Sequence, residues 1–172
     1  MNDAETFLLP LFVTMLSAVL AFIFSIVQKR IEFNNTRRSV AIALFVEIAH
    51  AKESAATFRR DWDEFREHVK DRDYRPLLVV SKDTDVLKRV HMEDFNYPQE
   101  IIHATTNFYG LIKDFYACLD SINSESFNLA SIGTRVHIVD LVISIGDEVV
   151  TSADAAINEY TAKFPSAWFF EK

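Results

Sequence analysis

The uncharged run FLLPLFVTMLSAVLAFIFSIV, from Phe7 to Val27, decides how this chain is organised. Its 21 residues include no charged or strongly polar side chain. A helix of that length rises about 31 Å, which is close to the hydrocarbon thickness of a bilayer. Helices buried in a protein core rarely lack a polar face over such a length. The run therefore predicts an N-terminal transmembrane helix.

A cleavable secretory signal is the alternative interpretation of this run, and its flanks disfavour it. Such signals begin with a basic region and end in small residues before a cleavage site. Here Asp3 and Glu5 make the leader acidic, and no such site follows the run. We expect residues 1–28 to remain as a short tail and an anchor, with residues 29–172 forming a second region.

Charges beside the run predict its orientation. Four basic residues follow it, and no lysine or arginine precedes it: Lys29, Arg30, Arg37 and Arg38. Positive charges favour the cytoplasmic side of a membrane, so we expect the N-terminus outside and residues 29–172 in the cytoplasm. The single cysteine, Cys118, cannot form an internal disulfide, which fits a reducing compartment. Inside the span, Ser17, Ala21 and Ser25 recur every fourth residue and predict a face for self-association.

Composition predicts a helical second region. Glycine occurs three times and proline four times in 172 residues, so long helices meet few interruptions. The net charge is −7; residues 29–90 hold 14 Lys and Arg against 11 Asp and Glu, and residues 91–172 hold 4 against 12. A concentrated basic face, which nucleic-acid binding requires, is lacking, so we expect no nucleic-acid partner.

Three heptad-spaced apolar stripes predict three helices, at about 36–69, 98–123 and 126–164. The first comprises Leu44, Ile48, Ala51, Ala55, Phe58, Trp62, Phe65 and Val69. The second comprises Ile101, Thr105, Phe108, Ile112, Phe115, Leu119 and Ile122. The third comprises Leu129, Ile132, Val136, Val139, Ile143, Gly146, Val150, Ala153, Ile157, Tyr160 and Phe164.

Packing the three stripes together predicts an all-α fold, an elongated antiparallel three-helix bundle that resembles a coiled coil. The turn near Asn123 is short, so the second and third helices should be antiparallel neighbours. An up-down-up order would then carry the C-terminal tail to the far end of the bundle from the bilayer. Gly146 on the third stripe invites close approach of another backbone.

Two segments outside the helices are candidate partner surfaces. The linker 71–97 is long for a compact domain and contains four apolar residues from Leu77 to Val80. The tail 165–172 concentrates Trp168, Phe169 and Phe170. Aromatic clusters anchor protein interfaces, but they also serve as caps over the end of a bundle.

The sharpest chemical motif is a repeated Glu-x-x-His spacing, at Glu47 and His50 and again at Glu100 and His103. Ferritin-like proteins hold two metal ions with such pairs, provided that the side chains project into the bundle core. Here the pairs lie beside the apolar stripes, and further helices that would supply glutamates are missing. We therefore expect no metal, no cofactor and no catalytic residue, and keep these four residues only as the metal candidates.

The anchor followed by RRSVAIALFVEI, and the stretch from Tyr97 to FYGLI, resemble small bacterial membrane proteins with an N-terminal anchor and a cytoplasmic helical region. That resemblance implies a single-pass protein of the bacterial inner membrane and carries no activity.

Three functions remain open on this evidence. The first is a non-enzymatic scaffold that binds a protein partner or itself at the membrane. The second is a regulatory or sensory subunit, in which a ligand or a partner changes the packing of the bundle near Gly146 and the linker. The third, which the stripes disfavour, is a metal-dependent oxidoreductase.

Overall fold

The computed structural model describes the backbone of residues 3–71, 73–76, 78 and 92–165, and their side chains except those of 3–16, 60 and 93. The chain divides into two compact units, Met1–Ser39 and Val40–Lys172. Every regular element among the described residues is helical, which confirms the all-α fold class.

The first helix, α1, begins at Asp3 and ends at His68. The sequence pattern predicts an anchor and a separate helix from about residue 36, whereas the structure has no break between them. Neither proline nor glycine occurs between residues 11 and 75, so nothing interrupts the backbone hydrogen bonds.

Among the described residues, no helix has enough length and apolar character to cross a bilayer. The predicted span lies partly outside this set, because the side chains of residues 7–16 are not described.

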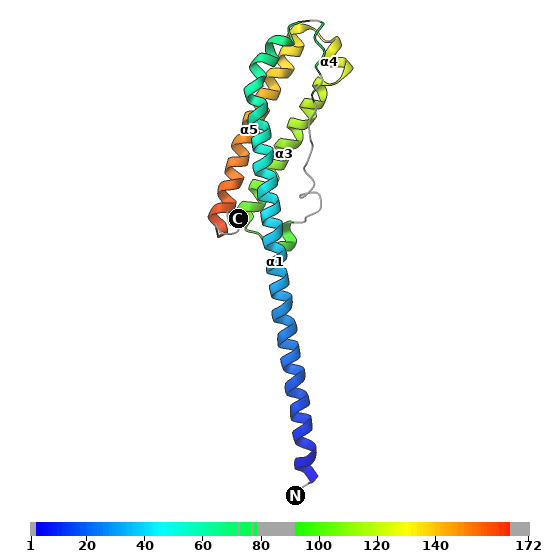
Figure 1. Ribbon diagram of the computed structural model, residues 1–172, viewed down its shortest axis with the longest axis vertical. Coiled ribbons are helices and arrows are strands. Elements are labelled where there is room, and N and C mark those ends of the chain that lie inside the picture. The colour runs from blue at the N-terminus through cyan, green and yellow to red at the C-terminus, as the bar shows by residue number, and fades with distance from the viewer. Residues whose placement is uncertain (1–2, 72, 77, 79–91, 166–172) are drawn as a thin grey trace. The chain divides into compact units, whose positions relative to one another are not determined.

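The second unit is a bundle of three helices that lie side by side: α1 from Val40 onward, α3 (Gln99–Ile122) and α5 (Ile132–Lys163) (Figure 1). A short 3₁₀ helix, η1 (Met92–Phe95), precedes α3, and α4 (Glu125–Leu129) links α3 to α5. Their apolar side chains form one contiguous core.

Helix directions in the bundle differ from the predicted up-down-up order. The last turns of α5 lie beside the first turn of α3, where Lys163 Nζ is 3.2 Å from Glu100 Oε1. The same part of α5 lies beside the first turns of α1 in this unit, where the rings of Phe45 and Tyr160 are 6.4 Å apart. Both α1 and α3 are therefore antiparallel to α5 and parallel to each other.

The parallel pair explains why the chain between α1 and α3 is long. Near its start, the Tyr74 carbonyl accepts a hydrogen bond from Arg135 in the first turn of α5. Near its end, the Tyr97 ring lies 5.9 Å from that of Phe164 just beyond α5. The connection must return along the bundle, and α3 alone rises about 36 Å. The predicted up-down-up order, in which the chain ends at the opposite end of the bundle from the start of its first helix, is therefore wrong, because Phe164 lies at the Val40 end.

The apolar stripe of α3 lies in the core as its heptad spacing predicts. Each of the seven predicted residues is at most 2% exposed: Ile101, Thr105, Phe108, Ile112, Phe115, Leu119 and Ile122. On α1 the predicted stripe is buried, apart from Phe58 and Phe65, which are half-buried. One continuous stripe at heptad spacing gives each of these helices a preferred face toward the core.

On α5, half of the predicted stripe is buried, and in the other half the buried residue is the one that precedes the predicted residue. Val139, Gly146, Ala153 and Tyr160 are buried as predicted. Five other residues of α5 are buried, namely Arg135, Val142, Val149, Ser152 and Ala156, whereas the predicted Val136, Ile143, Val150 and Ile157 are half-buried. From residue 142 onward both neighbouring positions are apolar, so spacing alone does not separate them. The smaller side chain takes the central position at Val142 and at Ala156, in place of Ile143 and Ile157.

The predicted third helix is two helices. Ala130 and Ser131 adopt extended backbone between α4 and α5. The hydroxyl oxygens of Ser124 and Ser131 accept hydrogen bonds from the Phe127 and Thr134 amides, so each serine caps a helix N-terminus. As a result Leu129, predicted in the core, is 78% exposed.

Three ion pairs join α1 to α5 at heptad intervals. They are Lys52 with Asp154 at 2.5 Å, Arg59 with Asp147 at 3.2 Å and Arg66 with Asp140 at 2.6 Å. Each step goes seven residues forward on α1 and seven back on α5, so a slip of one helix along the other would break all three. Their side chains are 35–57% exposed, so each pair alone contributes little to stability, and together they fix the register of the two helices.

Arg135 ties the segment after α1 to α5. It is 1% exposed, and its guanidinium donates hydrogen bonds to the backbone carbonyls of Asp71 at 3.0 Å and Tyr74 at 2.6 Å. The charge also lies over the Phe127 ring of α4, 5.3 Å from its centre. These contacts replace the water that a buried cation loses.

Candidate interaction surfaces

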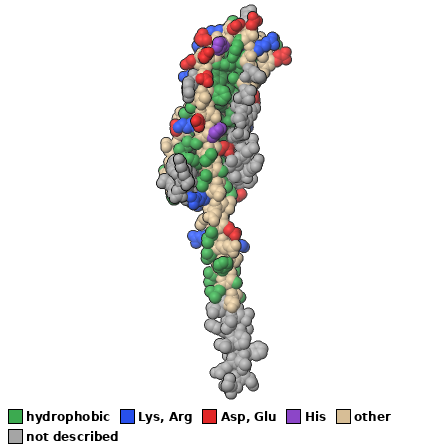
Figure 2. All heavy atoms as spheres, in the orientation of Figure 1, with side chains coloured by type: hydrophobic (Ala, Val, Ile, Leu, Met, Phe, Trp, Pro, Cys, Tyr) green, Lys and Arg blue, Asp and Glu red, His purple; other side chains and the backbone are tan. Residues whose placement is uncertain are grey.

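The first unit exposes a belt of large apolar side chains. All described side chains from residue 17 to 36 are exposed. We call seven of them the apolar belt, each 48–70% exposed: Val19, Leu20, Phe22, Ile23, Phe24, Ile26 and Val27. Residues on a helix turn about 100° each, so these nearly consecutive positions cover every face. Figure 2 shows apolar side chains on one side of this helix, in green above the grey tip. A surface of this kind marks contact with lipid or with another protein.

The predicted residues of the self-association face lie just before and within this belt, and those of the orientation signal follow it. Ser17, Ala21 and Ser25 are exposed on α1, and Lys29 and Arg30 are exposed after it. The remaining two, Arg37 and Arg38, are half-buried and make contacts within the chain.

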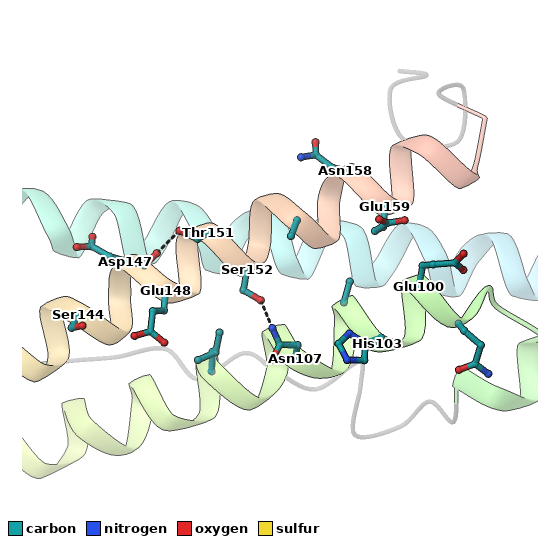
Figure 3. Close-up of a pocket in the computed structure, with 14 residues that line it drawn as sticks. Glu100, His103, Asn107, Ser144, Asp147, Glu148, Thr151, Ser152, Asn158 and Glu159 are labelled. Atoms are coloured by element: carbon teal, nitrogen blue, oxygen red, sulfur yellow. Dashed lines mark hydrogen bonds between the residues drawn. The ribbon is translucent and has the colours of Figure 1, made fainter.

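A groove of about 1250 Å³ lies between α3 and α5 in the bundle (Figure 3). Residues 99–111 of α3 and 144–159 of α5 line it. These stretches rise about 18 Å and 23 Å, so the groove extends over three to four helical turns. Small side chains, Ala104 and Ala155, contribute to its lining, and Asn107 Nδ2 donates a hydrogen bond across it to Ser152 Oγ at 3.4 Å.

The groove is acidic. Its lining includes the carboxylates Glu100, Asp147, Glu148 and Glu159, the imidazole of His103, and no lysine or arginine among the described residues. Asp147 is paired with Arg59 and Glu100 with Lys163. A hydrogen bond from its own backbone amide, and then Lys163, hold the pKa of Glu100 below its usual range. By contrast, Glu148 and Glu159 form no ion pair with any described residue.

The four metal candidates form one pair on α1 and one pair on α3, and both residues of the α3 pair line the groove. Glu47 is half-buried and His50 is exposed on α1. Glu100 is held by Lys163, and His103 lies in the groove. Within the described part of the chain, no three His, Cys, Asp or Glu side chains gather as metal ligands.

A polar cluster inside the bundle is absent from the sequence-based prediction. The Tyr109 hydroxyl lies beside the Glu47 carboxylate, and burial, followed by that carboxylate, raises the pKa of Tyr109. Burial also raises the pKa of Tyr160 to about 12, an effect that its hydrogen bond with Thr105 partly offsets. Heptad spacing indicates which residues face inward, and it carries no information on such hydroxyl partners.

The predicted partner surfaces in the linker and tail lie outside the described residues: Leu77, Val80, Trp168, Phe169 and Phe170. Leu78, between the first two, is described. Its amide donates to Asn123 Oδ1 and its carbonyl accepts from Asn123 Nδ2, both at 2.8 Å. Asn123 thus holds this residue at the C-terminal end of α3.

Cys118 is a half-buried free thiol on α3. Burial, followed by the charge of Asp114, raises its pKa. The reactive thiolate is therefore scarce at neutral pH.

Comparison with protein-family models, curated proteins and solved structures finds no match for this chain. Its function must therefore be argued from its own residues.

Proposed function

We propose that this chain is a non-enzymatic, membrane-anchored scaffold whose helical bundle holds a protein partner, or a second copy, at the bilayer. The apolar belt is the observation that carries this proposal. A helix that exposes large apolar side chains on every face is poorly soluble by itself, and a lipid environment removes that penalty.

The energetics of the belt support the anchor. Near the centre of a membrane helix, Leu, Ile, Phe and Val each favour insertion by about 0.3–0.6 kcal/mol. The seven belt residues together favour it by roughly 2–4 kcal/mol. The preceding run from 7 to 16 has the composition FLLPLFVTML, which extends the apolar stretch to the predicted span.

The basic residues after the belt support an orientation. With Lys29, Arg30, Arg37 and Arg38 on one side only, the positive-inside rule puts the bundle in the cytoplasm and the N-terminus outside. We propose the bacterial inner membrane as the location.

A scaffold requires a surface that remains available after the bundle has folded. The three stripes pack into one core, so folding uses the bundle's main apolar faces. The groove between α3 and α5 remains on the surface, with Glu148 and Glu159 unpaired among described residues.

Crosslinking in native membranes, followed by affinity purification of the chain, tests the scaffold. We expect a crosslinked species that contains a second protein or a second copy. Recovery of the chain alone, as a monomer under crosslinking conditions that trap a known membrane complex, would contradict the proposal.

A further inference from the structure

The two free carboxylates of the groove have a spacing that a partner helix can match. Glu148 and Glu159 are eleven residues apart on α5. Eleven residues turn a helix through about 1100°, which returns to the same face within about 20° and rises about 16 Å. The groove therefore presents two negative charges in line, three turns apart. In Figure 3, Glu148 points from α5 toward α3, into the space between the helices.

The lining between these charges admits close packing. Ala104 from α3 and Ala155 from α5 both lie in this stretch, and their short side chains leave room above the two helix backbones. Small residues let a third helix approach two others and insert its own side chains between them. The ends of the groove already hold paired carboxylates, Glu100 with Lys163 and Asp147 with Arg59.

We propose that this groove binds an amphipathic helix of a partner protein, one that carries two basic residues three turns apart with apolar residues between them. This inference rests on the proposed scaffold function and names the chemistry of its partner. Each basic side chain pairs with one of Glu148 and Glu159, and the apolar residues lie over the two alanines. The bound helix completes a four-helix arrangement at this face.

The chemistry disfavours other occupants. Anionic lipid headgroups and nucleic-acid phosphates are repelled by a groove with four carboxylates and no lysine or arginine among its described lining residues. An extended peptide would leave backbone amides and carbonyls without partners where they lie over Ala104 and Ala155. A helix satisfies these groups internally.

The test uses the full chain in phosphatidylcholine nanodiscs, which do not attract a basic peptide electrostatically. The probe is a fluorescent helical peptide of about sixteen residues, with two lysines eleven positions apart, leucine and alanine on the same face between them, and neutral polar residues elsewhere. Fluorescence anisotropy measures its affinity. Empty nanodiscs give the background, and circular dichroism verifies that each variant keeps its helix content.

We expect E148Q/E159Q to weaken peptide binding about fivefold to tenfold at low ionic strength, because two exposed ion pairs are lost. The matched control D114N/E125Q removes two carboxylates outside the groove lining and should leave the affinity within about twofold. Ala155→Trp should block peptide binding, because the indole ring would occupy the groove beside Ala155. A peptide with glutamates in place of both lysines should not bind.

The proposal is overturned if the lysine peptide does not bind, if the glutamate peptide binds equally well, or if E148Q/E159Q binds like the natural chain. Anchoring and crosslinking in native membranes are measured without the peptide. Loss of peptide binding with both of these intact therefore refutes the groove proposal alone, whereas a monomer in native membranes refutes the scaffold.

Discussion

Replacing Gly146 with alanine tests how α5 packs against α3. In a helix interior this exchange stabilises by about 1 kcal/mol, because alanine loses less backbone entropy on folding. Opposing it, the new Cβ would lie 3.2 Å from Cε2 of Phe115. That ring is 2% exposed and meets Phe58 edge-on at 6.3 Å, so it has little room to retreat. Overpacking costs about 1–3 kcal/mol. We expect G146A to lower the free energy of unfolding by about 0–2 kcal/mol.

A double-mutant cycle separates the two effects. In an F115L background the ring contact is removed, and G146A should raise the free energy of unfolding by about 1 kcal/mol. Gly110→Ala is the matched control, because a Cβ there meets nothing within 4 Å, and it should stabilise both backgrounds equally. Urea unfolding of the full chain in detergent, followed by circular dichroism, measures all variants. Equal stabilisation by G146A in both backgrounds would refute the close contact.

Three further predictions concern charges and hydroxyls of the bundle. The single charge reversals R59D and D147R should each lower the free energy of unfolding by about 0.5–1 kcal/mol. The double variant R59D/D147R should recover most of the lost stability, because the two charges are exchanged and can pair again. Additive losses in urea unfolding would argue against this ion pair. Arg135→Met should lower the free energy of unfolding by about 2–4 kcal/mol, because two backbone carbonyls lose a charged donor. The control Arg75→Met, at an exposed arginine, should change it by about 0.5 kcal/mol or less. An equally small effect of both substitutions would contradict the stabilising role of the Arg135 hydrogen bonds. The tyrosines should make stability fall above about pH 10, because the unfolded chain releases tyrosine protons that Tyr109 and Tyr160 retain. Each contributes up to about 1.4 kcal/mol per pH unit, so Tyr160→Phe should flatten the curve measured by urea unfolding at alkaline pH, and an unchanged slope would count against its burial.

The fold was predictable where only one arrangement buries the apolar residues. On α3 the heptad-spaced residues form one continuous stripe, whereas the apolar neighbours Ile102, Leu111 and Tyr116 do not continue at that spacing, and the structure buries the stripe. On α5, Val142 and Ile143, like Val149 and Val150, are adjacent and equally apolar in type. Which of them faces the centre depends on the neighbouring helices, and no local pattern contains that information.

The helix order was missed although the sequence contains a signal for it. Antiparallel neighbours are joined by short loops, whereas parallel ones require a connection that returns along the bundle. The residues 71–97 are long enough for such a return. The break before α5 also has a signal, because Ser131 stands three residues before Thr134 in a capping arrangement.

The candidate site could not be predicted, because it forms from residues without a distinctive pattern. Ala104 and Ala155 are ordinary helix residues, and Glu148 and Glu159 are typical of a solvated face. Only the packing of α3 beside α5 brings them to one groove. Similarly, Arg135 is one of many charged residues in the sequence, and its burial depends on carbonyls more than sixty residues away.

Alkaline carbonate extraction of membranes that contain the full chain tests the central claim most directly. The treatment releases proteins held at a membrane by charge or by partners, and it leaves embedded helices in place. With the apolar belt and the run that precedes it in the bilayer, the chain should remain in the membrane pellet. Release of the chain into the supernatant would contradict the anchor, and with it the proposed membrane scaffold.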